Sequence, residues 1–325
     1  MKLSKKIIIL LGLWLSVCIF KLDFSSAFKI LALFLGVSYL CIMDKEIYPK
    51  LKIAFYISCL FCLVQFIFYW FNPAFSSSIA GSNLSTIIWG EKFATPGFVN
   101  QYEVLFLPRM GGLSREAGFF ASLVIIMALI IYSREKTTLK EKILHSSAYI
   151  FSLSKVSFTN LLIIFLFPLR KVINKVPVAI SIIALSLSFI FLSNYINMSD
   201  NHFALANESV AHRLSSSYLI PRMKELDFIF GCIDIENCEY IVNSNLISDL
   251  AINKLYALTG LNGIFVNFGL IGFILLVFSF WWLGLKSFDV VVLTLISATV
   301  GIYTIDNFVI LTYYFLFTYK RYIGE

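Results

Sequence analysis

The side chains best suited to chemistry lie in a short polar run that directly precedes a long apolar stretch. The run, Pro108–Glu116, contains Arg109, Arg115 and Glu116. Charged groups at the mouth of a membrane-spanning helix are costly to dehydrate, so we expect them to face water, a partner charge or an anionic ligand. A carboxylate beside arginines stays ionised and can act as a base. An ion pair between Arg115 and Glu116 that only fixes the depth of the helix explains the same residues.

A second stretch, Ala211–Gly231, carries His212, Arg213 and Arg222. Its apolar residues recur at three- and four-residue steps, which is typical of an amphipathic helix lying on the membrane or on a helix bundle. The basic side chains could bind a lipid diphosphate, or they could only meet anionic headgroups, and their spacing favours neither.

Membrane-spanning helices must position these residues. The chain is 59% hydrophobic and 14% charged, with a mean hydropathy of +0.85, and no water-soluble domain of this size could bury so much apolar surface in one core. The apolar segments are long enough to span a bilayer, and they do not alternate as barrel strands would. We therefore predict an all-α integral membrane protein, with spans that include Leu51–Phe71, Gly118–Tyr132, Val178–Ile196 and Leu261–Leu285.

Clusters of basic residues beside these spans determine the expected topology. Lysine and arginine concentrate on the cytoplasmic side, so the clusters place both termini in the cytoplasm. Two such clusters flank His145–Leu169, which has the length of one span. We therefore predict a hairpin of two short helices here, with Ser152–Ser157 at its apex and Lys155 pointing into a cavity. The same reasoning predicts a second hairpin, Asp289–Tyr319, with its apex at Thr304–Asn307.

The prediction is a single polytopic membrane domain over residues 1–325 with about ten transmembrane or re-entrant helices. Two long extracytoplasmic loops are expected at about 72–112 and 197–258. Ile7–Phe20 is interpreted as an uncleaved first helix, because it lacks the small residues of a signal-peptide cleavage site. The net charge of +7 does not indicate nucleic-acid binding, since the basic residues serve as topology signals.

Metal binding is not predicted. The three histidines, His145, His202 and His212, are widely separated, and the sequence contains neither an H-E-x-x-H motif nor the pattern of a calcium-binding loop. No glycine-rich phosphate loop occurs either, so we expect no cofactor. Cys232 and Cys238 lie on the oxidising side in this topology, and we predict a disulfide that closes the small loop between them.

Four local features give the chain a resemblance to the bacterial O-antigen polymerase and O-antigen ligase superfamily, the Wzy-like proteins. Arg109-x-x-Gly-Leu-x-x-Glu116 is similar to an R-x-x-G-x-x-x-E-P element, with Ala117 in place of the proline. Phe151–Lys155 resembles an L-T-x-S-R hairpin apex, with lysine for arginine. Arg213–Gly231 matches an arginine, a helix and a terminal glycine, although Ile233 replaces the second glycine of G-x-G. Asn245–Leu275 resembles an asparagine-containing segment that ends in G-L-I-G.

The resemblance covers about the latter two-thirds of the chain. It implies a glycosyltransferase of the GT-C type in the bacterial inner membrane, which needs no metal and joins undecaprenyl-diphosphate-linked oligosaccharides with inversion. Its active site would face the periplasm, and a chain-length regulator protein is a possible partner. The implied cations for the diphosphate are Arg109, Arg115, Lys155, Arg213 and Arg222, with Glu116 as the base and His212 as a second candidate base.

The leading functional prediction is a polymerase of surface polysaccharide repeat units. A ligase that transfers finished polymer to lipid A-core uses the same chemistry, and the sequence barely separates the two. A lipid-linked oligosaccharide transporter or flippase is the alternative from another class, because intramembrane charges and broken helices also mark transport pathways.

Overall fold

Uninterrupted apolar runs of leucine, isoleucine and phenylalanine form the long helices of this protein. A computed structural model describes residues 5–81, 83–84, 87, 103–104, 107–114, 116–152, 157–196, 208–232 and 259–323. These residues are helical apart from turns and two two-residue strands, β1 (Glu103–Val104) and β2 (Leu107–Pro108), which pair antiparallel. The predicted all-α class is therefore confirmed.

Five helices among the described residues are long and apolar enough to cross a membrane. All four spans named from the sequence fall on helices of this set, and the fifth is an N-terminal helix. The five helices are α2 (Phe24–Ile42), α3 (Asp44–Phe71), α6 (Ala117–Arg134), α10 (Val178–Tyr195) and α16 (Asn262–Trp282).

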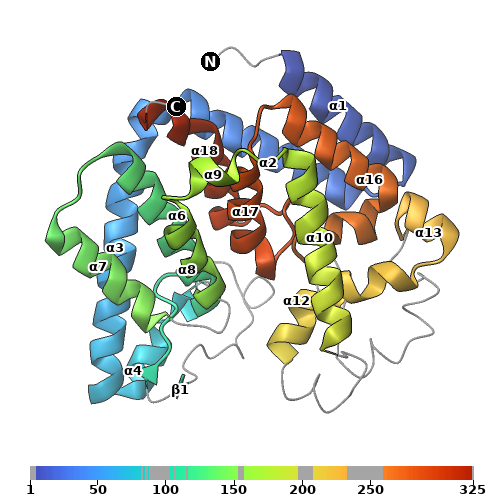
Figure 1. The fold of residues 1–325 in the computed structure, drawn as a ribbon. Coiled ribbons are helices and arrows are strands. Elements are labelled where there is room, and N and C mark those ends of the chain that lie inside the picture. Colours follow the sequence, from blue (N-terminus) through green and yellow to red (C-terminus); the bar gives the residue numbers. More distant parts are fainter. Residues whose placement is uncertain are drawn as a thin grey trace. The chain divides into compact units, whose positions relative to one another are not determined.

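The chain divides into two compact units, each built from segments distant in sequence (Figure 1). Unit 1 comprises residues 1–38 and 167–310, and unit 2 comprises residues 39–166 and 311–325. Besides most of α2, α10 and α16, unit 1 holds α1 (Lys5–Phe20), α9 (Arg170–Ile173), α12 (Glu208–Leu219), η1 (Ile220–Arg222), α13 (Glu225–Phe230), α17 (Ser287–Ile296) and η4 (Ser297–Thr299).

Unit 2 is organised around α3 and α6. It also holds α4 (Pro73–Ser78), the two strands, α7 (Leu139–Phe151), α8 (Ser157–Leu166) and most of α18 (Asn307–Tyr322). At one end of this unit the Arg134 guanidinium donates to Asp44 Oδ1 at 2.9 Å and to Thr318 Oγ1 at 3.0 Å. Tyr314 and Tyr322 also donate their hydroxyls to the Asp44 carboxylate, so this buried polar cluster joins α18 to α3 and α6.

Both predicted hairpins coincide with breaks in helical structure. α7 ends at Phe151 and α8 begins at Ser157, so two short helices occupy the segment that has the length of one span. Residues 153–156 of the predicted apex, including Lys155, lie outside the described residues. In the second segment, α17 ends at Ile296 and α18 begins only at Asn307. The depth of these segments in a membrane stays a prediction.

The predicted amphipathic helix at Ala211–Gly231 is wrong in two respects. The helix breaks into α12 and α13 at η1, because Pro221 has no backbone N–H to continue the ladder. In α12 the side chains are buried on every face from Leu214 to Leu219, including three consecutive serines. α12 therefore packs inside unit 1 against α10 and α16, which agrees with the alternative of a helix that lies on the helix bundle.

Candidate functional site

The predicted catalytic run forms a tightly held turn in unit 2, which we call the Arg109–Glu116 turn. Its central residue, Gly112, donates its backbone N–H to Gln65 Oε1 of α3 at 3.1 Å. The Gly112 carbonyl accepts the N–H of Gly81 at 3.1 Å. Gln65 is fully buried, and its main chain is joined to α4 by a 2.9 Å hydrogen bond from Ser76 Oγ to Gln65 O. One glutamine in an apolar helix therefore fixes the turn.

Glycine is required at two positions of this contact. Gly112 has φ +55°, and a Cβ there would lie 3.1 Å from the Phe120 ring of α6. A Cβ on Gly81 would collide with the backbone carbonyls of Leu113 and Ser114. Gly112 thus allows the turn to lie against α6, and Gly81, which lies outside the motif, allows the chain after α4 to approach the turn.

The Arg109–Glu116 turn also contacts the first predicted hairpin. Met110, next to Arg109, donates its backbone N–H to the Phe151 carbonyl at the end of α7, at 2.7 Å. The Phe151 ring stacks on Phe66 of α3 with centroids 3.8 Å apart. Two of the segments expected to form the site, the turn and the start of the hairpin apex, are therefore joined by backbone hydrogen bonding within one unit. Half-buried Arg109 lies on this turn.

Glu116 caps the N-terminus of α6 through its backbone. It is extended, at φ −145° and ψ 145°, and its carbonyl accepts Phe120 N–H at 3.0 Å. Its half-buried side chain makes no capping hydrogen bond, so the N-terminus of α6 does not occupy the carboxylate. Arg115 lies outside the described residues, so the alternative of an Arg115–Glu116 ion pair stays open.

The return helix of the hairpin is joined to the helix that Glu116 begins. Asn160 of α8 donates Nδ2 to Ser122 Oγ of α6 at 2.9 Å, and Ser122 Oγ donates to the Gly118 carbonyl at 3.2 Å. All three residues are buried. A polar connection inside the apolar unit therefore sets α8 against the first turn of α6.

The predicted site residues after Lys155 lie in unit 1, on α12 and the segment that follows it. Asn262, the first residue of α16, donates Nδ2 to Ser217 Oγ of α12 at 2.8 Å and to the Ser186 carbonyl of α10 at 3.2 Å. Ser216 Oγ donates to the Thr259 carbonyl at 3.0 Å. These buried bonds explain why serines occupy the interior of α12, and they fix the helix that carries Arg213.

Arg213 and Arg222 differ in their surroundings. Arg213 is half-buried on α12. Arg222 Nη1 donates to Asn194 Oδ1 and to the Tyr218 carbonyl, both at 2.8 Å, and its guanidinium lies 3.6 Å from the Tyr218 ring centroid. Arg222 thus joins η1 to α10 and α12, and its binding to a diphosphate stays a prediction. The His212 side chain lies outside the described residues.

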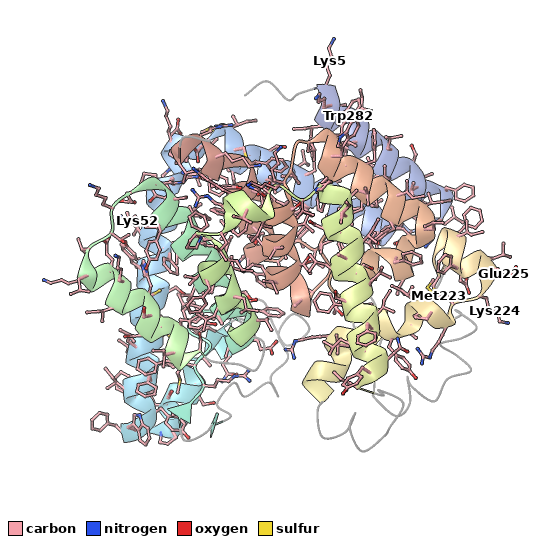
Figure 2. All side chains as sticks on the ribbon, viewed as in Figure 1. Lys5, Lys52, Met223, Lys224, Glu225 and Trp282 are labelled. Atoms are coloured by element: carbon pink, nitrogen blue, oxygen red, sulfur yellow. The ribbon has the colours of Figure 1, made fainter. Side chains whose placement is uncertain are left out.

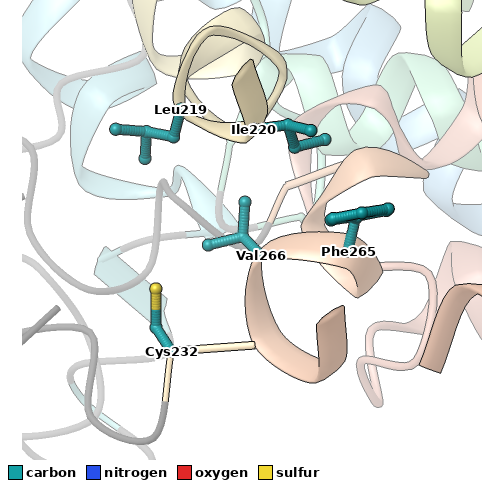
Figure 3. Packing of buried hydrophobic residues seen from close by; sticks show 5 residues of the cluster. All are labelled: Leu219, Ile220, Cys232, Phe265 and Val266. Carbon is teal, nitrogen blue, oxygen red and sulfur yellow. The ribbon is translucent and has the colours of Figure 1, made fainter. Parts of the chain in front are cut away.

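Cys232 lies where α13 returns to α16. It is disulfide-bonded, and the predicted partner, Cys238, lies outside the described residues. Its N–H donates to the Val266 carbonyl at 2.9 Å. Figure 3 shows Cys232 near Val266, with Leu219 at the end of α12 and Ile220 of η1. All four belong to one buried cluster with Phe265. Cys18, Cys41, Cys59 and Cys62 are buried free thiols, as expected of packing residues.

Two of the side chains that hold these segments, Gln65 and Asn262, are not among the residues predicted from the sequence. Both carried a signal, because a polar amide beside or within a long apolar run is costly unless it has a partner. The positioned candidates fall into two groups, with Arg109 and Glu116 in unit 2 and Arg213 and Arg222 in unit 1. The described ranges contain no cluster of three or more histidine, cysteine, aspartate or glutamate side chains.

The chain was compared with family models, curated proteins and solved structures, and none of them matches it.

Proposed function

We propose that this protein is a surface polysaccharide polymerase of the Wzy-like type, with its site on the extracytoplasmic face of a bacterial inner membrane. The observation that carries the proposal is the Arg109–Glu116 turn. It is fixed by buried Gln65, bonded to the end of α7, and it presents a carboxylate at the start of α6 that its own helix does not use. A rigid turn that presents a cation and a carboxylate together suits a reaction needing both an anion-binding group and a base.

In the proposed reaction, the hydroxyl of an acceptor repeat unit attacks the anomeric carbon of a glycan linked to undecaprenyl diphosphate. A carbon–oxygen bond forms, the bond between the anomeric carbon and the phosphate oxygen breaks, and the diphosphate leaves on its lipid. Glu116 accepts the proton of the hydroxyl. Arginine is suited to the negative charge on the leaving diphosphate, because its guanidinium is always charged and binds phosphate in a bidentate manner. Arg109 takes that role here, with Arg115 and Lys155 as further candidates, and the same role for Arg213 of unit 1 stays a prediction from the sequence.

The topology belongs to the same proposal. About ten transmembrane or re-entrant helices of the GT-C type place both termini in the cytoplasm. The breaks between α7 and α8 and between α17 and α18 are the two re-entrant apices. The first long loop then ends in the Arg109–Glu116 turn, and the second contains α12 and α13.

Two substitutions test the proposal. Glu116→Gln removes the base and keeps the size of the side chain, and Arg213→Ala removes a cation. Glu225→Gln and Lys224→Ala are matched controls, since both side chains project from α13 (Figure 2). In a strain that lacks the wild-type gene, we expect Glu116→Gln and Arg213→Ala to leave single repeat units on the core, whereas the controls restore long glycan. Normal glycan length with membrane-inserted Glu116→Gln and Arg213→Ala proteins would overturn the proposal.

A transporter of lipid-linked oligosaccharides is the second candidate, because broken helices line many transport pathways. The observations that favour it are the two helix breaks and the non-helical Gly269 inside α16. A deletion strain separates the candidates, since loss of a polymerase leaves one repeat unit on the core. Loss of a ligase or of a flippase leaves none.

A further inference from the structure

Unit 1 contains a buried lysine that the proposed reaction does not use. Lys21 lies in the short turn between α1 and α2, and only 6% of its surface is exposed. A lysine at the end of an apolar helix ordinarily extends its ammonium to the headgroup region. Lys21 instead donates Nζ to two backbone carbonyls, Asn267 O of α16 and Cys232 O at 3.0 Å.

The carbonyls that Lys21 binds lie at a crossing of two backbones. α16 is interrupted at Gly269, which has φ 64° and ψ −161°. Gly231, which has φ +78°, lies directly against this break, and a Cβ on Gly231 would lie 2.6 Å from Gly269 N. A helix break leaves carbonyls of the preceding turn without helical partners, and these need another donor when buried. The Lys21 ammonium supplies that donor at the last turn before the break.

Neighbouring side chains compensate the charge of Lys21. The ammonium lies 5.3 Å from the Phe268 ring centroid, and the Asp23 carboxylate is in the same turn. Asp23 accepts Ser26 N–H at 2.9 Å and Asn267 Nδ2 at 3.2 Å. Asn267 Nδ2 also lies 2.9 Å from the Tyr303 hydroxyl. The Asn267 side chain and backbone therefore connect the α1–α2 turn, α16 and the segment before α18.

We propose that Lys21 is a positioning residue, which holds the Cys232 end of the α12–α13 segment (Glu208–Cys232) against the break in α16. We call this contact the Lys21 clamp. It rests on the proposed function only in so far as the segment carries Arg213 and Arg222; the contact itself does not depend on it. Substitution of Lys21 releases the segment at Cys232, 19 residues beyond Arg213 in the sequence.

Burial lowers the pKa of Lys21 from 10.5 to about 8. The charged and titratable groups that act on it are Asp23 in its own turn, Cys18 of α1 and Asp227 of α13, and all three oppose that shift. Because a neutral amine still donates N–H groups, the clamp can bind both carbonyls in either protonation state.

Amide hydrogen exchange of the full-length protein in detergent tests the clamp. The Cys232 N–H is bonded to Val266 O, and the Gly231 N–H to Asp227 O at 2.7 Å, so both report on the segment. We expect Lys21→Met to lower the protection of these amides at least about tenfold, because methionine resembles the aliphatic part of lysine and has no N–H donor. Lys224→Met, on the exposed part of the same segment, is expected to leave protection unchanged. Wild-type protection in Lys21→Met would overturn the proposal.

A second variant and a second assay distinguish failure of the clamp from failure of the proposed function. If Lys21→Met does not insert into the membrane, Lys21→Gln is measured in its place. Glutamine keeps N–H donors on a shorter side chain, so we expect a smaller loss of protection than the loss expected for Lys21→Met. Protection equal to that of wild type would again refute the clamp. Glycan length is measured for the same variants. Lost protection with shortened glycan supports both the clamp and the role of Arg213. Lost protection with normal glycan supports the clamp and contradicts the assignment of Arg213 to the site.

Discussion

The crossing of the backbones at Gly231 and Gly269 is tested most directly by Gly231→Ala, because this substitution adds only one methyl group. The residue has φ +78° and ψ 164°, a region open almost only to glycine, so alanine costs about 1–3 kcal/mol in backbone strain. Its Cβ would collide with Asn267 O and would lie 2.6 Å from Gly269 N, both backbone atoms that cannot rotate away. Separation of the two backbone segments also breaks the hydrogen bond from Cys232 N–H to Val266 O, and the buried donor left without a partner costs about 1–3 kcal/mol.

The expected destabilisation by Gly231→Ala is therefore about 4 kcal/mol. Gly284→Ala is the matched control, because Gly284 also has a positive φ, +70°, with no atom within 4 Å of an added Cβ. It adds backbone strain without a collision. We expect the apparent melting temperature of the detergent-solubilised protein to fall several degrees further for Gly231→Ala than for Gly284→Ala. Equal decreases for the two variants would refute the reasoning, since strain alone would then explain both.

Three further predictions concern other contacts. Arg134→Met leaves the Asp44 carboxylate buried without its cation, so we expect it to destabilise the protein by about 3–5 kcal/mol. Lys52→Met breaks a more exposed ion pair with Glu135, and in the same thermal assay it should destabilise the protein by less than about 1 kcal/mol. Because folding lowers the pKa of Lys21 from 10.5 to about 8, the unfolded chain binds more protons between these pH values. The stability that Lys21 contributes therefore rises with pH across that window, and the melting temperatures of wild type and Lys21→Met should diverge; a constant difference would contradict this. Thiol labelling without reductant should leave Cys232 and Cys238 unmodified, and labelling of both would contradict the disulfide.

The sequence predicted the helices well, because their signal is local. The run Val178–Ile196 is apolar on every side and becomes α10 at nearly the expected length, whereas Leu51–Phe71 is the second part of the longer helix α3. The break between α7 and α8 was also predicted, since two basic clusters that are expected on the same side of the membrane cannot be joined by one span.

The surroundings of the candidate residues were harder to predict, because they depend on distant partners. The serines of α12 resemble an exposed polar face, yet Ser217 bonds to Asn262, 45 residues away in the chain. Proline chemistry could have predicted the break at Pro221, but the three- and four-residue spacing of apolar residues continues across it and favoured one continuous helix. Lys21 was not among the candidates predicted from the sequence, and its burial is explained by the crossing of Gly231 and Gly269, which lie far from it in the chain.

The most direct test of the polymerase proposal is elongation by the purified protein. It is reconstituted in liposomes with undecaprenyl-diphosphate-linked repeat units in the presence of EDTA, and the products are separated by length. We expect a ladder of lengthened glycans from the wild-type protein and only the starting unit from Glu116→Gln. An equal ladder from both proteins, or elongation by the wild type that requires a divalent cation, would contradict the proposed site and chemistry.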